Sequence, residues 1–576
     1  MNSLPRPLGP SPFTDEQTQY LTGFVAGVRQ RMSTFSDFFN TDAFHAAAAK
    51  APAEQEEETV LIAEERIKKE EHPLDAYHRI IENARADQAP EKEDIFRFKW
   101  NGLFYQSPID DSYMARLRIP GGKLKSFQLR EIAAVANDLT TGYIQITTRA
   151  NLQIRSIRPK DAPAVLRRIQ SVGLHTRGSG ADNIRNITCN PTAGVDPAEL
   201  IDCSPFVDDL AHIIISQREF YDLPRKFNIS FDGGGLVSTA EDTNDIGAKA
   251  VLLENQVAFR IGLGGATGHR KFASDLGVVV PPEEIVSVVL AVIRVFIARG
   301  NRANRKKARL KHLLETLPIG EFLEAVETSL GRKLRRVPLD VTPLTWPSAD
   351  TPHSHVGAHP QKQPGLHYLG VSVPVGQLTA RQLIRLADLA ENYASSDLRL
   401  TVWQNIILTG IPDAYLNTVK KAVEKIGLRW TQSNVATGIV ACTGSRHCKF
   451  AATATKAHAI SLMKHLEKKL RIDQPVNIHV TGCPNSCAQH YMGDIGLLGT
   501  KTRDGREAYH LFVGGGFGAN QACGRQVFQS MPFEEVRTTI ETMLRAWLKH
   551  RDPGESFHTF TSRHDLNALQ VMFCEA

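Results

Sequence analysis

An internal repeat constrains this fold more than any other feature of the sequence. Residues 120–154 align without a gap with residues 374–408, at an offset of 254 (374 − 120). Nine aligned positions are identical and most of the others keep their apolar character, which indicates duplication rather than chance. We therefore predict that the two halves of the chain are one duplicated unit with pseudo-twofold symmetry. An interface on such an axis is a natural place for a shared ligand.

The spacing of apolar residues predicts the elements of the repeat. It favours a helix over residues 124–139, a strand over 143–154, a helix over 162–172 and further strands beyond. The apolar run 285–293 is stopped by Arg294, well short of the roughly 20 residues of a membrane span, and predicts a buried helix. The expected fold class is α+β.

Composition narrows the class of protein. The 576 residues, 42% hydrophobic and 23% charged, predict a soluble globular protein of roughly four domain-sized units. The N-terminus shows no apolar segment after a basic start and no cleavage pattern, so we expect a cytoplasmic protein without a membrane anchor. Eight cysteines are too few for a disulfide scaffold, and clustering among them indicates metal or redox chemistry.

Two segments lie outside the repeat. Residues 1–95 are polar, and their charged stretch between positions 54 and 71 predicts a solvated helix or a flexible arm. Residues 336–364 hold six prolines and few apolar residues, which is typical of a linker. Histidines without a Cys or carboxylate partner are more often exposed than metal-bound, and the linker carries three, His353, His355 and His359.

Four cysteines follow the pattern C-x5-C…C-x3-C: Cys442, Cys448, Cys483 and Cys487. Structural zinc prefers shorter C-x2-4-C spacing, so the pattern favours an iron–sulfur cluster and leaves zinc as the alternative. The position that matches Cys442 in the first half is Thr188, so only one half carries the site. Cysteines without ligand spacing are expected to be small buried hydrophobes, namely Cys189, Cys203, Cys523 and Cys574.

The net charge of +6, from 68 Lys+Arg against 62 Asp+Glu, is compatible with nucleic acid, an acidic protein partner or an anionic cofactor. The most basic stretch is residues 300–314, which we expect to form a helix. No aromatic residues interleave its cations, so a nucleic-acid helix is disfavoured. A solvated face remains the alternative for three of these cations, Arg305, Lys306 and Lys307.

The motifs CTGSRHC and TGCPNSCAQHYMGDIGLLG, together with RLRIPGG, ITTRANLQI and LPRKFN, resemble the sirohaem-dependent nitrite and sulfite reductases over about residues 97–576. The resemblance implies a duplicated fold of two ferredoxin-like half-domains and two larger α/β cofactor-binding domains. It also implies a monomer with one 4Fe–4S cluster joined to a sirohaem iron through a shared cysteine thiolate. The implied reaction is the six-electron reduction of nitrite to ammonia or of sulfite to sulfide.

With this resemblance the chain divides into six parts. They are a helical, charged extension (1–95), a first ferredoxin-like half-domain (96–170), a first sirohaem and substrate domain (171–335), the linker (336–364), a second half-domain (365–430) and a 4Fe–4S and sirohaem domain (431–576).

The resemblance also implies roles for individual residues. The four clustered cysteines match the cluster ligands, and Cys487 matches the bridging ligand. Residues matching the substrate site are Arg116, Arg185, Lys226 and Asn228. Residues matching sirohaem contacts are Thr147, Arg149, Gln153, Arg225, Arg309, Lys311, Thr481 and Asn485, with Cys487.

The expected substrate follows from one departure from the family motif, and the expected donor follows from a motif that the sequence lacks. Sulfite-reducing members usually carry Lys-Phe-Lys where this chain has Lys226-Phe227-Asn228, so the lost cation favours nitrite over the more highly charged sulfite. No nucleotide-binding fingerprint is present, which predicts a separate donor, either reduced ferredoxin or a flavoprotein. The alternatives are a sulfite reductase, a precorrin-modifying relative and a nucleic-acid-binding protein with a structural cluster.

Overall fold

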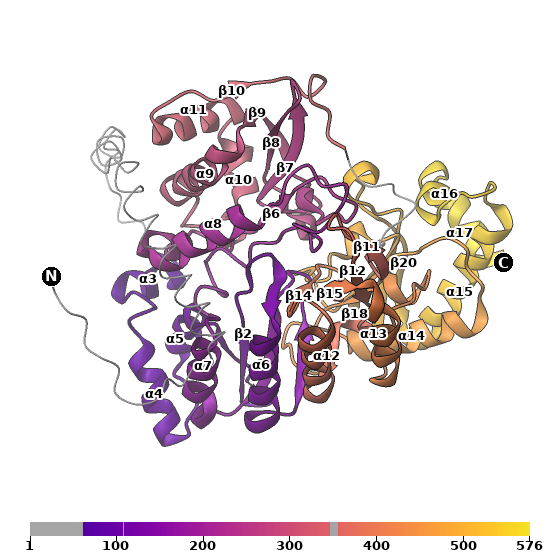
Figure 1. The fold of residues 1–576 in the computed structure, drawn as a ribbon, viewed down its shortest axis with the longest axis horizontal. Helices are drawn as coiled ribbons and strands as arrows, with labels where there is room; N and C mark the ends of the chain where they lie inside the picture. Colours follow the sequence, from indigo (N-terminus) through magenta and orange to yellow (C-terminus); the bar gives the residue numbers. More distant parts are fainter. Residues whose placement is uncertain (1–60, 108, 346–354, 576) are drawn as a thin grey trace. The chain divides into compact units, whose positions relative to one another are not determined.

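The structure is a computed structural model that describes residues 61–107, 109–345 and 355–575. Most of the predicted N-terminal extension therefore lies outside the described residues. Within the described part, four five-stranded sheets alternate with helices along the chain (Figure 1). Two of these sheets form the half-domains. The other two belong to the larger domains, one of which holds Lys226 just before its first strand, while the other holds the cysteine motifs just after its first two strands.

The half-domain sheets exchange a strand with each other. The first has the order β1-β2-β5-β4-β13 and the second β11-β12-β15-β14-β3. Strand β3 (Lys123–Lys125) belongs to the first repeat but pairs with β14 (Asp397–Leu400), and β13 (Gln377–Thr379) pairs with β4 (Tyr143–Ile146). Because the exchange is reciprocal, each half-domain adds one short edge strand to the other's sheet, next to β4 in the first and next to β14 in the second.

The helices of the repeat keep the offset of 254 residues. Helix α6 spans Ser126–Leu139 and α12 spans Ala380–Tyr393, so both ends differ by 254. The two helices lie side by side (Figure 1) and are joined by Arg130, which donates to Asp388 at 2.8 Å and also pairs with Glu391. The predicted helices at 124–139 and 162–172 are confirmed within two residues, the second as α7 (Ala162–Ser171).

The strand predicted over residues 143–154 is wrong. The chain forms β4 and then β5 (Leu152–Ile157), which pair as an antiparallel hairpin. Ala150 adopts a left-handed backbone with φ 47°, and its N–H donates to the Thr147 carbonyl at 3.1 Å, which closes a turn. The apolar alternation continues on both sides of this turn, so periodicity alone did not reveal it.

One apolar core runs through both half-domains. Leu129 and Ile132 of α6 and Leu383 and Leu386 of α12 are fully buried in the same cluster. Burying a side chain of this size contributes roughly 1.5–3 kcal/mol. The remaining strands of these sheets are β1 (Leu103–Tyr105), β2 (Tyr113–Arg116), β11 (Gly357–Pro360), β12 (Leu366–Val371) and β15 (Ile406–Pro412), with helix α13 (Asp413–Lys425) in the second repeat.

The two larger domains repeat a second pattern. In the first, β6 (Ile229–Asp232) pairs parallel with β7 (Ile246–Leu253), and β8 (Gln256–Leu263) and β9 (Ser274–Val280) continue antiparallel. In the second, β17 (Ile478–Thr481) and β18 (Ile495–Lys501) are parallel, and β19 (Glu507–Val513) and β20 (Arg525–Pro532) continue antiparallel. Edge strands differ, because β16 (Ile439–Ala441) adds beside β17, whereas β10 (Arg335–Arg336) adds beside β9.

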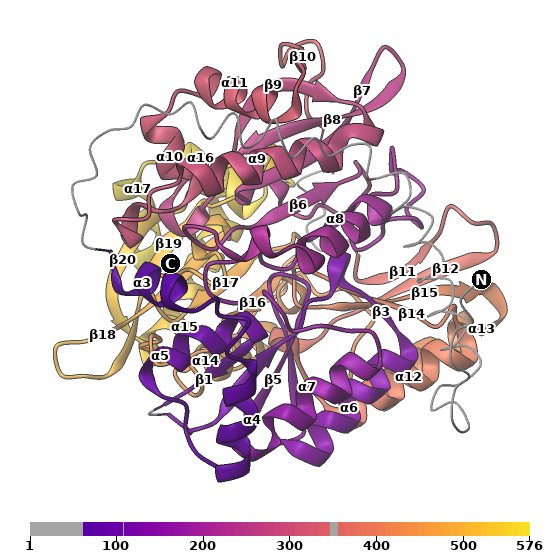
Figure 2. The same cartoon turned by 90° about the vertical axis from the view of Figure 1, so that its left-hand side faces the viewer.

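Helices cover these larger sheets. In the first domain they include α9 (Ile285–Arg299) and α11 (Ile319–Leu330), which lie beside each other (Figure 2). Helix α9 confirms the predicted buried helix at 285–293. The others are α8 (Ser204–Ser216), α10 (Leu310–Thr316), α14 (Thr455–Lys469), α15 (Phe533–His550), α16 (Phe557–Arg563) and α17 (Leu566–Glu575). Among the described residues no helix is both long and apolar enough to cross a membrane.

The charged segment before the first half-domain is packed rather than solvated. Helix α3 (Ala63–Glu70) buries Glu65 and Lys68, which pair at 2.5 Å. Glu65 also accepts from Arg302 at 2.9 Å, and Lys68 donates to the Leu223 carbonyl at 3.1 Å. The prediction of a solvated helix or arm is therefore wrong here, because these charges have buried partners distant in sequence. Helices α4 (Tyr77–Ala86) and α5 (Lys92–Arg97) complete the segment.

The predicted linker contains strand β11 at its C-terminal end. His355 is fully buried and its Nε2 accepts from Asn405 Nδ2 at 3.1 Å, and His359 stacks on Tyr368 with ring centroids 4.9 Å apart. The prediction of exposed histidines is wrong for both, because the proline-rich chain returns to pair with β12. His353 lies outside the described residues.

The four cysteines outside the motif differ in how deeply they are buried. Cys189 and Cys203 are buried, as predicted. Cys523 is half-buried, and Cys574 is exposed on the last turn of α17, so the prediction of burial is wrong for Cys574.

Candidate active site

The turn that follows β4 places Arg149 in the interior. Its Nη2 donates to the backbone carbonyls of Asn186 (2.7 Å) and Ile229 (2.9 Å), and its Nη1 binds the Asn244 side chain. Burial lowers the pKa of Arg149 to about 10, and its buried Nε has no hydrogen-bond partner. A guanidinium whose buried Nε has no partner is costly unless an anion lies beside it.

Two other predicted residues stabilise this turn. Thr147 binds Asn151 through its hydroxyl and accepts from the Arg149 N–H at 3.1 Å. Gln153, on β5, is buried and accepts from Arg155. Both side chains therefore hold the turn and the strand that carry the cations.

Arg116 and Arg185 meet at one backbone carbonyl. Arg116 Nη1 donates to Ser179 O at 3.3 Å, and Arg185 Nη1 donates to the same oxygen at 2.7 Å. Burial and mutual repulsion lower the pKa of Arg185 well below its ordinary value, and burial lowers that of Arg116. Neither guanidinium forms an ion pair with a carboxylate of the described chain. Two adjacent, unneutralised cations are suited to binding an anion.

Lys226 approaches the same group of cations from the segment before β6. Burial and the nearby Arg309 lower the pKa of Lys226 to about 7. The neighbouring Asn228 is half-buried, and its backbone N–H donates to Asp245 Oδ2 at 2.8 Å. Asp245 also binds Arg309 through both carboxylate oxygens, at 2.7 and 3.1 Å. The Lys226–Asn228 segment and Arg309 are thus fixed by one buried carboxylate.

The remaining predicted cations are partly neutralised within the chain. Arg225 lies 3.5 Å from Asp182, and Arg305 binds the same carboxylate at 2.7 and 2.8 Å. Lys311 Nζ pairs with Glu315 at 3.1 Å. Arg305 is therefore not on a solvated face, whereas Lys306 and Lys307 are exposed.

The prediction of one helix over the basic stretch 300–314 is wrong. It contains a single turn, η9 (Arg305–Lys307), and then the first residues of α10. Its arginines turn inward to buried carboxylates, which interrupts the helix: Arg302 to Glu65, Arg305 to Asp182 and Arg309 to Asp245.

The cysteine motifs follow two adjacent parallel strands. Cys442 comes directly after β16, and Cys483 and Cys487 come after β17. The Gly482 N–H donates to Cys442 Sγ at 3.2 Å, and burial raises the pKa of the Cys483 thiol to about 11. Buried thiols with raised pKa values become thiolates when a metal binds them. Cys448 belongs to the same group, since its charge contributes to the raised pKa of Cys483.

This donor set fits an iron–sulfur cluster better than a single ion. Among residues 61–107, 109–345 and 355–575, no three His, Cys, Asp or Glu side chains converge on one ion position. The four thiolates of a 4Fe–4S cluster each bind a different iron, so their sulfurs need not converge. Amide donation to sulfur, seen from Gly482, is typical of such sites.

Two other predicted residues shape the second cysteine loop. Thr481 is fully buried and accepts from the Ala488 N–H at 3.3 Å. Asn485 is exposed, and its backbone N–H donates to the Cys483 sulfur. Thr481 therefore fixes the loop from within, and the Asn485 side chain stays free to contact a bound group.

The cation site and the cysteine loops are in direct contact. Thr148 Oγ1, in the turn after β4, donates to the Cys487 carbonyl at 2.8 Å. Arg155 on β5 donates to Thr443 Oγ1 at 2.7 Å, one residue after Cys442. The second repeat therefore provides the cysteines of the site, and the first repeat places its cations beside them.

Sequence reasoning missed Arg155 and Lys456. Both are buried; the pKa of Arg155 is lowered to about 10 and that of Lys456 to about 7, chiefly by desolvation, and the charge of Cys442 acts on both. Arg155 shares a face of β5 with Gln153, so strand alternation contained a signal for it. Lys456 donates to the Ala441 carbonyl at 3.3 Å from α14, a contact that no local pattern predicts.

Replacing Arg155 with methionine should lower the reduction potential of the cluster. The guanidinium is a buried positive charge near the cysteines, and removing it disfavours the more negative, reduced state. Redox titration of the purified holoprotein, followed by absorption, measures the shift. Arg167→Met, on the exposed side of α7, is the matched control and should leave the potential unchanged. An unchanged potential in Arg155→Met would contradict this electrostatic role.

Comparisons with known proteins identify the family of the chain. The "Nitrite and sulphite reductase 4Fe-4S domain" model matches residues 180–334 and 432–559, and the "Nitrite/Sulfite reductase ferredoxin-like half domain" model matches 107–172 and 359–426. The Synechococcus elongatus "Ferredoxin--nitrite reductase" is 38% identical over 78% of this chain and 88% of its own length. The Haloferax mediterranei "Assimilatory ferredoxin-dependent nitrite reductase" is 33% identical over 83% and 86%.

A solved structure confirms the fold class. The NirA protein of Mycobacterium tuberculosis superposes with a TM-score of 0.82 at 30% identity, covering 88% of this chain and 97% of that one. Together with the two matched domain types, each found twice, this confirms the predicted duplicated α+β fold and the predicted resemblance. The chain belongs to the nitrite and sulfite reductase family.

Proposed function

We propose that this protein reduces nitrite to ammonia, with a sirohaem and a 4Fe–4S cluster as cofactors and reduced ferredoxin as donor. The observation that carries the proposal is the pair Arg116 and Arg185, half-buried cations without an ion pair to a described carboxylate, in a site that contacts the cysteine loops through Thr148 and Arg155. The relatives named above as ferredoxin-dependent nitrite reductases support the substrate and the donor.

When bound, the sirohaem supplies an iron that takes the substrate and the cluster supplies electrons one at a time. Arg116 and Arg185 orient the anion by donating to its oxygens and offset the negative charge that builds there. Lys226, with a pKa lowered to about 7, donates a proton to a departing oxygen and regains one from solvent. Lysine suits this role better than arginine, which does not release its proton.

The unpartnered donors also fit the acidic cofactor. Arg149 has a free buried Nε, and Arg225 and Lys311 keep donors beyond their single ion pairs. These three, with the Arg309 donors that Asp245 leaves free, would bind sirohaem carboxylates. The Cys442, Cys448, Cys483 and Cys487 thiolates would hold the cluster.

We propose that nitrite is preferred over sulfite because position 228 lacks a cation. Asn228→Lys should raise the ratio of kcat/KM for sulfite to that for nitrite by roughly 10- to 100-fold, since a charged hydrogen bond contributes about 1.5–3 kcal/mol. Steady-state kinetics with reduced methyl viologen measures both substrates. Asn137→Lys adds the same charge on the exposed side of α6 and should leave the ratio unchanged. A ratio that is equally unchanged in Asn228→Lys would contradict the specificity proposal.

We propose that the donor docks beside Cys448. Phe450 is 63% exposed, and the neighbouring Arg446 and Lys449 are exposed cations in the same loop. An exposed aromatic ring flanked by cations suits an acidic protein such as ferredoxin, and the cluster cysteine ensures a short electron path.

Reversing the charge of this loop should slow reduction by ferredoxin. Lys449→Glu is expected to raise the KM for ferredoxin about tenfold at low salt while turnover with the small donor methyl viologen stays at the wild-type level. Lys468→Glu, exposed on α14, is the matched control. Equal losses with both donors would place the defect in the cluster rather than in docking.

We further propose a cytoplasmic, monomeric enzyme. The nucleic-acid alternative loses its support, because the three arginines of the basic stretch bind the chain's own carboxylates rather than facing solvent. Sedimentation of the purified protein tests the monomer, and a stable dimer would contradict it.

A further inference from the structure

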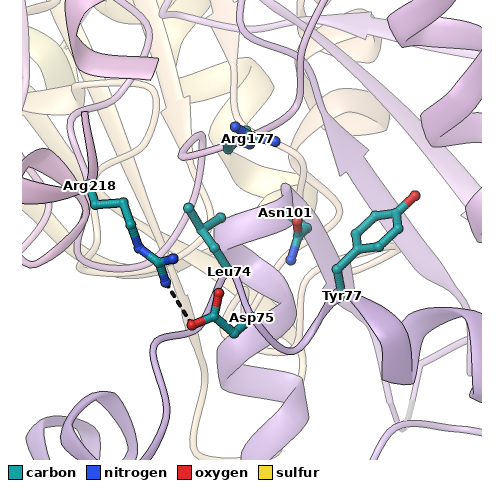
Figure 3. A pocket seen from close by; sticks show the side chains of 6 residues that line it. All are labelled: Leu74, Asp75, Tyr77, Asn101, Arg177 and Arg218. Carbon is teal, nitrogen blue, oxygen red and sulfur yellow. Dashed lines mark hydrogen bonds and ion pairs between the residues drawn. The ribbon is translucent and has the colours of Figure 1, made fainter. Parts of the chain in front are cut away.

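A pocket is lined by Arg177, two residues before the Ser179 carbonyl that accepts from Arg116 and Arg185. It has a volume of about 330 Å³ and is lined by Leu74, Asp75, Tyr77, Asn101, Arg177 and Arg218 (Figure 3). Leu74 and Asp75 come from the segment between α3 and α4, and Tyr77 is the first residue of α4. The others come from η2 (Phe98–Asn101), from the segment after α7 and from η5 (Arg218–Tyr221). None of them belongs to the site described above.

Asn101 gives this pocket an unsatisfied donor. The residue is 8% exposed, and its side-chain Nδ2 has no hydrogen-bond partner. Its backbone carbonyl accepts from Thr176 Oγ1 at 2.7 Å, which fixes its position. In Figure 3 its side chain lies between Leu74 and Tyr77. Since a buried amide donor without a partner destabilises the folded chain, a ligand that accepts from Nδ2 would offset this cost.

The charges of the pocket favour a monoanion. Arg218 is paired with Asp75 at 2.7 Å, so these two charges offset each other (Figure 3). Arg177 is exposed and forms no ion pair with any carboxylate that the structure describes. Arg177 interacts with the Tyr221 phenol and keeps further donors, whose planar arrangement matches a carboxylate. A phosphate dianion would face Asp75 with one cation fewer than it needs. Leu74 and Tyr77 provide an apolar wall.

We propose that this pocket binds a small organic carboxylate, with the carboxylate between Arg177 and Asn101 and its apolar part against Leu74 and Tyr77. The size suits such a ligand, since small-molecule pockets begin at about 300 Å³.

The pocket is connected to the active site through one short segment. Arg177 lines the pocket with its side chain, and its backbone carbonyl accepts from Arg118 Nε at 3.2 Å. Two residues later, Ser179 O accepts from both Arg116 and Arg185. A carboxylate that fixes Arg177 therefore stabilises the segment that orients the two cations, and its binding should lower the KM for nitrite.

Titration of the purified holoenzyme with benzoate tests the proposal. Benzoate carries one carboxylate on a planar apolar body, and we expect saturable binding by ligand-observed NMR that weakens at least tenfold in Arg177→Gln. Arg167→Gln, an exposed arginine on the same stretch of chain, is the matched control and should bind as the wild type does. Asn101→Leu keeps the side-chain size, removes the Nδ2 donor and should also weaken binding.

Three results would overturn the proposal. Benzoate affinity that is unchanged in Arg177→Gln would place the probe elsewhere, and displacement of benzoate by nitrite in direct competition would place it in the active site. Inorganic phosphate that binds more tightly than benzoate would contradict the carboxylate class. Because all readouts are binding measurements, they remain informative even if nitrite turnover is absent.

Discussion

Replacing Cys483 with serine should remove iron from the protein and lower nitrite turnover by more than about 100-fold. Loss of a residue that only contacts a metal ligand usually lowers activity by about 10- to 100-fold, so a larger loss indicates a ligand. Cys483 is 8% exposed and its neighbours are Cys442, Cys448 and Cys487, so no other thiol is placed to substitute for it. A serine oxygen is a harder ligand and reaches less far than a thiolate sulfur. Iron and acid-labile sulfide per chain, measured beside activity, report the result.

The matched control is Cys574→Ser. Cys574 is exposed on α17 and has no ligand spacing, so its iron content and activity should equal those of the wild type. Far-UV circular dichroism distinguishes loss of the cluster from loss of the fold. Full iron content in Cys483→Ser would contradict the proposed ligand set.

Replacing Lys226 with methionine should lower kcat for nitrite by about 10²–10³-fold, the usual cost of removing one group that stabilises developing charge. Methionine keeps the length and apolar stem of lysine, so the main loss is the ammonium and its proton. Lys306→Met is the matched control, because Lys306 is an exposed lysine of the basic stretch. Iron content equal to the wild type ensures that the effect arises at the substrate. Wild-type kcat in Lys226→Met would contradict its role as a proton donor.

The pH dependence of turnover has a definite sign. The pKa of Lys226 is lowered to about 7, so the ammonium form predominates below that pH and is lost as the pH rises through it. kcat/KM for nitrite should therefore fall on the alkaline side, by up to tenfold per pH unit. An anionic group bound beside the lysine raises the pH at which the ammonium form is lost, but kcat/KM still falls as the pH rises. Lys226→Arg stays charged and should flatten the alkaline fall, and a profile identical to the wild type would contradict the assignment.

The repeat made much of the fold predictable. Helices α6 and α12 begin and end 254 residues apart, as the gapless alignment requires. The turn at residues 147–151 was missed because apolar residues alternate on both sides of it, and the backbone conformation of Ala150 is not visible in a hydrophobic pattern. The strand exchange was also beyond local reasoning, since the end of β3 and the start of β14 are 272 residues apart (397 − 125).

The cysteine loops were predictable from spacing, but the environment of the charges was not. Arg302, Arg305 and Arg309 looked like a basic surface, yet each binds a carboxylate distant in sequence. Lys456 reaches the Cys442 strand from a helix with an ordinary amphipathic pattern. Ion pairs and desolvation depend on tertiary contacts, which a single sequence does not specify residue by residue.

The stoichiometry of nitrite reduction shows whether this protein is a six-electron nitrite reductase. The purified holoprotein is given reduced methyl viologen, and the viologen oxidised, nitrite consumed and ammonium formed are measured together. We expect six electrons consumed per nitrite and one ammonium formed, because the balanced reaction takes six electrons and eight protons and releases two waters. Nitrite consumed without ammonium, or no nitrite consumed by protein with a full complement of iron and sirohaem, would contradict it.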